Sequence, residues 1–535
     1  MLSKKLVFAA AFCLAATAIS TYAQTQRGAL VEGFPQRVGS LTASQLQARL
    51  EGPERNQDVM YQGIMRMPTG KSILELAGAK IKCGVDVWYM QFSTFGGANE
   101  PGIVSGAVMV PSGGGDCAGP RPVVLYARST SMLKNVNIAD LNQNYLGEPE
   151  MLAALFASQG YIVIATNYAG YEKSTLNYHP YLNADQQSKE MIDALSAGKE
   201  ALAKIGNRVT SNGKLLILGY SQGGFVAMAT HKAMQELGMD VTASAPGAGP
   251  FAMGLFGDNV FRGIESTPAD TLQLPLLITG FQRAYGDIYK SPSELFREPF
   301  AHGIENILPT TKDLPTLFRE GRLPPRAVFS EQAPEAADSS IQLAFEAVTP
   351  PVTRTAVDAA TKQSFGTPYL ITNEARRDFL LDVMAYPDGA SISPKGVGLP
   401  NVESRSPLRR AFQRSDLRDW TPRRPLMMCS LQSNPWVSYK TNQQLMIDLW
   451  TNLPEGTVTS LDLEEDIQSD DPDYFKELKK EFQASRQTIV DTAIAKGATD
   501  GGQANLTNAY HHWLGEPLCM AASLKFFNNV LEASK

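Results

Sequence analysis

The chain contains few of the residues that build metal centres, since its 535 residues include only five cysteines and five histidines. The cysteine spacings fit no zinc pattern, and we expect neither a metal nor an organic cofactor. An excess of positive charge is also absent, because 54 acidic residues outnumber 48 basic ones and the net charge is −6. A mildly acidic chain gives no reason to expect a nucleic acid or an anionic membrane as a partner.

Long apolar runs are absent except at the start of the chain. There Lys4 and Lys5 precede an apolar run over residues 6–19, and small residues follow before Gln24. The run is too short to span a bilayer comfortably, and this order is typical of an export signal. We therefore predict a signal peptide over residues 1–23, no integral membrane segment, and export to the periplasm or the medium.

The cysteines that follow the predicted signal are Cys83, Cys117, Cys429 and Cys519. An even number of thiols in an oxidising compartment favours disulfides, and four thiols allow three pairings. We favour Cys83–Cys117, which would tie the first strands together, and Cys429–Cys519, which would tie two late segments. The alternative is four free, buried thiols.

The pattern of the first half of the chain predicts an α/β fold. A hydrophobic content of 43% and a charged content of 19% suit a folded globule. Early strands are expected at residues 85–92 and 103–110. Strand patterns and helix patterns then alternate, with strands at residues 123–126, 161–166, 215–218 and 241–245 and helices at 152–159, 185–204 and 225–237. Such alternation predicts a mostly parallel sheet with helices on both faces.

The alternation stops after Pro250 and resumes with strands at residues 426–430 and 458–463. We therefore predict an N-terminal arm over residues 24–80, a core formed by residues 81–250 and 425–535, and a mainly helical cap inserted over residues 251–424. The cap shows no clear strand. Its arginine-rich end, residues 403–424, also contains acidic residues, and we expect a solvated helix and linker there in preference to a binding patch.

Residues 219–223 read Gly-Tyr-Ser-Gln-Gly and follow the apolar strand pattern of residues 215–218. A helix-compatible stretch comes next, so Ser221 lies where a strand turns abruptly into a helix. The flanking glycines let two backbones pass close together, and the serine can then project into a cleft above the sheet. The same five-letter pattern arises by chance in loops, but its context here favours a function. We predict that Ser221 is a nucleophile.

A serine hydroxyl needs a base, and histidine is the usual one. His231 lies on the helix that runs away from Ser221, His302 lies in the cap, and His179 precedes a proline in an early loop, where we expect a structural role. In such sheets the base comes from a loop after the last strand, which leaves His511 and His512. The alternative is that both are surface histidines in a polar loop.

Several motifs occur in a specific order, namely Asn-Tyr-Ala-Gly-Tyr at 167–171, His-Pro-Tyr-Leu at 179–182, the serine motif at 219–223, Ser-Ala-Pro at 244–246, and Tyr510-His511 shortly before Cys519. Together they resemble the secretory lipases of the α/β-hydrolase superfamily, the lipase-A type known from fungi and bacteria, in patches over most of residues 80–530. The resemblance implies an α/β-hydrolase sheet, hydrolysis of carboxylic esters, Ser221 as nucleophile and His511 as base. His512 stands where the family usually has a small residue.

The chain departs from this family at two places. The family's acid lies in a pattern like Asp-Pro-x-Val, and the corresponding residues 434–437 here begin with Asn434. In a serine triad that replacement costs about 10⁴ in turnover, because an amide favours the wrong imidazole tautomer. Residues 128–130 read Arg-Ser-Thr where bacterial relatives tend to show His-Gly-Thr. That loop, at Thr130, is expected to give one oxyanion donor, and the N–H of Gln222 the other.

Another carboxylate could take the place of the missing acid. Asp462 ends the last predicted strand, and Glu464, Glu465 and Asp466 follow it, so Asp462 or Asp466 is an alternative partner for the imidazole. A solvated acidic loop is the simpler interpretation, and Asn434 fits the family's register.

Two functions of different classes fit these observations. The first is an exported ester hydrolase, a lipase or esterase, that works through an acyl-enzyme with Phe251, Met253, Leu255 and Phe256 of the cap lining the acyl pocket. The second is a catalytically impaired protein of this fold that binds an apolar or acyl ligand under the cap, which Asn434 motivates. The substrate is a small-molecule ester or lipid in the first case, and acyl transfer and peptide cleavage remain open beside ester hydrolysis. The sequence does not predict an oligomeric state.

Overall fold

The computed structural model describes residues 26–51, 65–142, 147–206, 208–267, 269–350, 364–389, 391–392 and 398–534. The predicted signal peptide, residues 1–23, lies outside the described residues. Within the described ranges no helix combines the length and the apolar character needed to cross a membrane.

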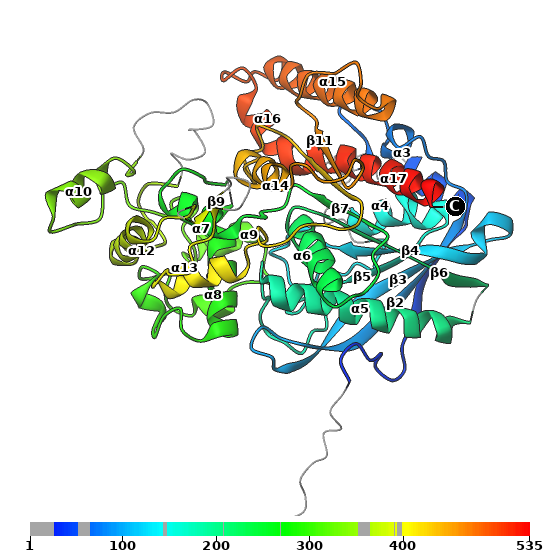
Figure 1. The fold of residues 1–535 in the computed structure, drawn as a ribbon, viewed down its shortest axis with the longest axis horizontal. Coiled ribbons are helices and arrows are strands. Elements are labelled where there is room, and N and C mark those ends of the chain that lie inside the picture. The colour runs from blue at the N-terminus through cyan, green and yellow to red at the C-terminus, as the bar shows by residue number, and fades with distance from the viewer. Residues whose placement is uncertain are drawn as a thin grey trace, which may run out of the picture.

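A nine-stranded mixed sheet forms the centre of the molecule (Figure 1). Its spatial order is β1 (Gln36–Leu41), β2 (Gly84–Phe95), β3 (Pro101–Ser112), β5 (Ile162–Thr166), β4 (Gly119–Ala127), β6 (Val209–Tyr220), β7 (Ala243–Gly247), β10 (Leu426–Ser430) and β11 (Val458–Asp462). The strands from β1 to β5 pair antiparallel, and those from β5 through β4 to β11 pair parallel. The predicted, mostly parallel sheet is therefore confirmed.

Helices cover both faces of the sheet, because strands such as β5, β7 and β10 are buried at every residue and need apolar partners on each side. One face packs against α5 (Ala184–Ile205) and α6 (Gln222–Glu236). The other packs against α1 (Ala43–Glu51), α3 (Ile73–Leu76), α4 (Glu148–Leu155) and α17 (Glu516–Ala533), with α15 (Asp473–Ala495) and α16 (Gln503–Ala509) alongside.

The predicted N-terminal arm takes part in the sheet, which the sequence did not indicate. Strand β1 pairs antiparallel with β2, from Gln36 opposite Tyr89 to Leu41 opposite Val85. Most of β1 is exposed, so it lacks the apolar alternation by which an internal strand is recognised.

The segment between β7 and β10 forms the predicted cap, which lies to one side of the sheet in Figure 1. Its helices are α7 (Met253–Phe261), α8 (Asp270–Tyr285), α9 (Leu314–Arg319), α10 (Ser339–Glu346), α12 (Asn373–Ala385) and α13 (Pro407–Arg414). The cap also contains the strand pair β8 (Ser391–Ile392) and β9 (Gly398–Leu399), although no strand was expected there. Strands of two residues are too short to leave a periodic pattern. The short α14 (Leu445–Leu449) follows β10.

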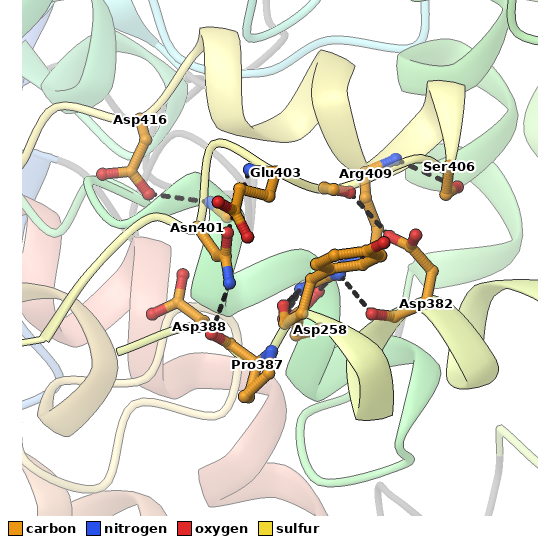
Figure 2. A network of polar contacts seen from close by, with 12 residues as sticks. Asp258, Asp382, Pro387, Asp388, Asn401, Glu403, Ser406, Arg409 and Asp416 are labelled. Carbon is orange, nitrogen blue, oxygen red and sulfur yellow. Dashed lines mark hydrogen bonds and ion pairs between the residues drawn. The ribbon is translucent and has the colours of Figure 1, made fainter. Parts of the chain in front are cut away.

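The arginine-rich end of the cap is only partly the solvated helix and linker that its composition suggested, because Arg405, Arg414, Arg423 and Arg424 are exposed but Arg409 and Arg418 are buried. Arg409 is 1% exposed and pairs with Asp258 at 2.7 Å and with Asp382 at 2.8 Å. Figure 2 shows Arg409 beside these two carboxylates. Arg418 is 3% exposed and likewise binds Asp388 and Asp416. The acidic partners of Arg409 come from α7 and α12, far away along the chain, so local composition could not reveal the burial.

Both predicted disulfides are formed. Cys83 and Cys117 join the start of β2 to the β3–β4 connection. Cys429 and Cys519 join β10 to α17. The second bond connects the strand that leads to Asn434 with the helix that follows His511.

Candidate active site

Ser221 lies in a strained turn between β6 and α6. Its φ of 58° and ψ of −122° belong to a region that a residue with a side chain rarely adopts, at a cost of about 1–3 kcal/mol. A Cβ at Gly219 would overlap the backbone of Gly223, and one at Gly223 would overlap that of Ala127. The glycines are thus required by the close approach of three backbone segments, and they set Ser221 at the carboxyl end of the parallel strands.

Asn434 and His511 meet at this edge. Asn434 Oδ1 accepts the backbone N–H groups of Trp436 at 3.0 Å and Val437 at 3.3 Å. These two donors fix the orientation of the amide, so its Nδ2 faces His511 Nδ1 at 2.7 Å. An amide N–H2 donates, and His511 Nδ1 must therefore accept, which puts the imidazole proton on Nε2. This is the tautomer that cannot take a proton from a serine at Nε2.

His511 is fully buried and lies in a π-helical turn, Tyr510–Gly515, between α16 and α17. A loop was expected there, but both flanking segments are helical and the turn continues them. Burial lowers the pKa of His511 well below its usual value, and the charge of His512 lowers it further. Within the described residues, His511 Nε2 has no hydrogen-bond partner, while its ring packs beside Tyr220 and Trp436.

The two alternative acids do not contact the imidazole. Asp462 ends β11 and accepts the N–H of Glu464 at 3.0 Å, and burial raises the pKa of Asp462. Asp466 is exposed. Among the contacts of the described residues, neither reaches His511. Glu464 of this acidic cluster contacts the chain neighbours of the pair, because it accepts hydrogen bonds from Ser433 N–H and Tyr510 O–H, one residue before Asn434 and His511 respectively.

Gln222 opens α6, where the first backbone N–H groups have no intrahelical acceptor. Its side-chain Nε2 donates to His179 Nε2 at 2.7 Å, while His179 Nδ1–H donates to Ala169 O at 3.0 Å. Burial and the charge of Arg128 lower the pKa of His179 to about 3, so the ring is neutral and can accept at Nε2. His179 thus holds the residue after the nucleophile. The sequence suggested only a structural role, although the His-Pro-Tyr-Leu motif carries the signal.

Thr130, the other expected oxyanion residue, follows β4, and its Oγ1 lies 3.1 Å from Tyr181 Oη. Ser129 before it is fixed through its backbone N–H, which donates to buried Glu148 Oε1 at 2.8 Å. The loops after β4, β6 and β10 therefore bring Thr130, Ser221 and Asn434 to the same edge of the sheet.

A cavity of about 30 Å³ lies beside Ser221 and Gln222. Its walls are mainly apolar and come from Leu182, Pro250, Phe256, Val260, Leu274, Leu277 and Val437, with Tyr181, Asp270, Gln273 and Trp436. Of the four cap residues expected to line it, only Phe256 does so. Phe251 and Met253 are fully buried in the core, and Leu255 lines a neighbouring cavity of about 460 Å³ with Asn434 and Trp436. Helix α8 supplies the wall that these residues were expected to form.

Comparisons with known proteins agree with this architecture. Residues 150–246 match the model of the prolyl oligopeptidase family, and no curated protein matches the chain. The rice cell wall degrading esterase LipA from Xanthomonas oryzae superposes with a TM-score of 0.59 at 22% identity, over 89% of this chain and 99% of that one. A putative hydrolase from Legionella pneumophila gives a TM-score of 0.56 at 15% identity, over 86% and 98% of the two chains.

The predicted fold class is therefore confirmed, and the protein has the α/β-hydrolase fold. Folds of this kind host many chemistries, so the activity has to be argued from the site.

Proposed function

We propose that the protein is an exported serine hydrolase of the lipase-A type, which cleaves carboxylic esters through an acyl-enzyme. The observation that carries this proposal is the strained turn that holds Ser221 beside a cavity at the carboxyl edge of the sheet. Ser221 Oγ attacks the ester carbonyl, His511 takes its proton and returns it to the leaving alcohol, and water then releases the acid. The backbone N–H groups of Gln222 and Thr130 hold the oxyanion.

The amide at residue 434 makes this reaction slow in the native protein. For His511 to accept a proton at Nε2, its own proton must first move to Nδ1, where it faces the N–H2 of Asn434. The imidazolium that forms during attack also has no carboxylate beside it. Both effects oppose proton transfer, and we expect a turnover far below that of a complete triad.

The small cavity favours short acyl groups. About 10–15 Å³ of such space is needed for one water molecule, so 30 Å³ suits an acyl tail of one or two carbons. Leu274 and Leu277 of α8 close it. We therefore place esters of short acids ahead of long-chain triglycerides. The two disulfides also support export, because such bonds persist in oxidising compartments.

The direct test is labelling by a fluorophosphonate probe, together with hydrolysis of p-nitrophenyl esters from acetate to octanoate. Labelling and turnover should both disappear in Ser221→Ala. The matched control is Ser244→Ala, since Ser244 is a buried serine whose Oγ lies 2.8 Å from His231 Nδ1, away from the site. We expect this control to keep its activity. Wild-type protein that neither takes up the probe nor hydrolyses any ester would refute the proposal.

A second function is favoured by the Asn434–His511 hydrogen bond, namely binding of an apolar or acyl ligand without turnover. Titration calorimetry of wild-type protein with butyrate and octanoate distinguishes the two functions. Binding of a fatty acid by a protein that fails the labelling test would support the second one.

A further inference from the structure

The oxyanion loop, residues 128–130, rests on three charged side chains that are buried almost completely. Arg128, Glu148 and Glu516 are 0%, 2% and 0% exposed. Burying a charged side chain costs free energy unless hydrogen bonds compensate the loss of water. The hydrogen bonds of these three side chains therefore show which parts of the site they fix.

Glu516 is the member of this group that touches both halves of the site. Its Oε1 lies 3.2 Å from Ser129 Oγ, across 387 residues of sequence, and shares the single hydroxyl proton of Ser129 with Tyr220 O, also at 3.2 Å. Its Oε2 lies 2.9 Å from His512 Nδ1, one turn earlier along the helical segment. One carboxylate thus connects the oxyanion loop to the turn that carries His511, whose ring centre lies 4.5 Å from that of His512.

The other two charges contact the same loop. Glu148 Oε1 accepts both Tyr126 O–H at 2.6 Å and Ser129 N–H at 2.8 Å. Arg128 Nη1 donates to Ser129 O at 3.1 Å, and its guanidinium lies 4.5 Å from the ring centre of Tyr171. Burial raises the pKa of Glu148, while the charge of Arg128 opposes this and that of Glu516 adds to it. Ser129 is therefore held at its N–H by Glu148 and at its carbonyl by Arg128, while its hydroxyl contacts both Glu516 and Tyr220 O.

We propose that Glu516 is a positioning residue for the ester-cleaving reaction, which fixes the oxyanion loop through Ser129 and the His511–His512 turn through His512. This inference rests on the proposed function. Its physical basis is that Thr130 is the next residue after Ser129, so any shift of Ser129 moves the Thr130 N–H relative to the developing oxyanion. Misplacement of such a group by about 1 Å costs as much as 10²-fold in rate.

The test compares Glu516→Gln, Ser129→Ala and the double variant with wild type. Glutamine keeps the volume of the side chain and removes its charge. We expect each single variant to lower kcat about 10-fold at an unchanged KM, because the oxyanion forms only in the transition state. The double variant should lose little more than Glu516→Gln alone, since the part of the effect that passes through Ser129 is already lost when Glu516 is replaced.

The matched control is another buried serine–glutamate pair, Ser485 and Glu481 of α15, with Ser485 Oγ 2.8 Å from Glu481 Oε1. Glu481→Gln and Ser485→Ala should lower the melting temperature and leave kcat unchanged. A purely structural role for Glu516 would give the same result as this control, and that outcome would overturn the inference. Additive losses in the double variant would also overturn it.

Failure of this inference is distinguishable from failure of the proposed function. If the wild type lacks both turnover and fluorophosphonate labelling, the proposed function is wrong and this inference falls with it. If the wild type is active and Glu516→Gln retains its kcat, only the inference is wrong.

Discussion

His511 and His512 follow one another in the same π-helical turn, but their Nδ1 atoms face opposite kinds of partner. His511 Nδ1 meets the N–H2 of Asn434, whereas His512 Nδ1 meets the carboxylate of Glu516. The first contact places the imidazole proton on Nε2, and the second favours a proton on Nδ1 with a free lone pair on Nε2. The difference shows that a buried carboxylate is present at this site, but that it faces the neighbouring histidine and the oxyanion loop.

Replacing each histidine in turn separates the roles of the pair. We expect His511→Ala to lower turnover by about 10²-fold, because the amide at residue 434 already removes much of what the base contributes, and His512→Ala to cost about 10-fold through loss of the Glu516 contact. Steady-state kinetics with p-nitrophenyl acetate measures both losses. A larger loss of turnover in His512→Ala than in His511→Ala would identify His512 as the base and contradict the assignment of His511.

The substitution Asn434→Asp gives His511 Nδ1 a carboxylate partner, as His512 Nδ1 already has in Glu516. One carboxylate oxygen would keep the N–H groups of Trp436 and Val437, and the other would accept His511 Nδ1–H. We expect kcat to rise by about 10² to 10⁴-fold. A carboxylate favours the protonated imidazole and raises the pKa of His511, so the acid limb of the pH–rate profile should move to higher pH.

The control for this prediction uses the alternative acids. Asp462→Ala and Asp466→Ala should change turnover little in either background, because neither side chain contacts His511. An unchanged kcat in Asn434→Asp, with loss of activity in one of these two variants, would show that the acid lies in the β11 cluster.

Removing the Cys429–Cys519 disulfide tests whether the positions of Asn434 and His511 depend on a covalent link. Replacing Cys429 and Cys519 by serine should lower kcat several-fold at temperatures where far-UV circular dichroism is still native. Replacing Cys83 and Cys117 removes a comparable bond at the start of β2 and should lower stability alone. The loss of one native disulfide typically costs about 2–5 kcal/mol. Equal kinetic effects of the two pairs would contradict a local role for Cys429–Cys519.

A smaller effect is expected from Glu265, which lines the 460 Å³ cavity on the Asn434 side. Burial raises the pKa of Glu265 to about 7, so its stabilising contribution is present at low pH and is lost as the pH rises through 7. Glu265→Gln keeps the acceptor for Asn259 Nδ2 and cannot ionise. We expect a gain of about 1–3 kcal/mol at pH 8 and little at pH 4, below the pKa of the carboxyl in the unfolded chain, measured by thermal unfolding. A gain at both pH values would mean that the charge of Glu265 is not the cause.

Much of this site could be predicted from sequence, because its main parts depend on local patterns. The glycines around Ser221 and the apolar strand before it specify the turn, while the resemblance to the secretory lipases is what put Asn434 at the position that partners His511. The remainder depends on contacts between distant segments. Ser129 and Glu516 are 387 residues apart, and no periodicity connects them. Likewise the hydrogen bond between Gln222 and His179 forms only when α6 lies beside the loop before α5, so no local sequence pattern reveals it.

The buried ion pairs of Arg409 and Arg418 join α7, α12, α13 and the segment before β10, and breaking such a pair typically costs about 3–5 kcal/mol. Helix α8, which supplies Leu274 and Leu277 to the cavity beside Ser221, contributes no residue to these pairs. Helix α7 takes part in both, since its Asp258 pairs with Arg409 while its Phe256 and Val260 line the cavity, but the cavity residues of α8 are independent of the ion pairs. Substitutions at Leu274 and Leu277 should therefore change the volume of this cavity without breaking the ion pairs that hold the rest of the cap together.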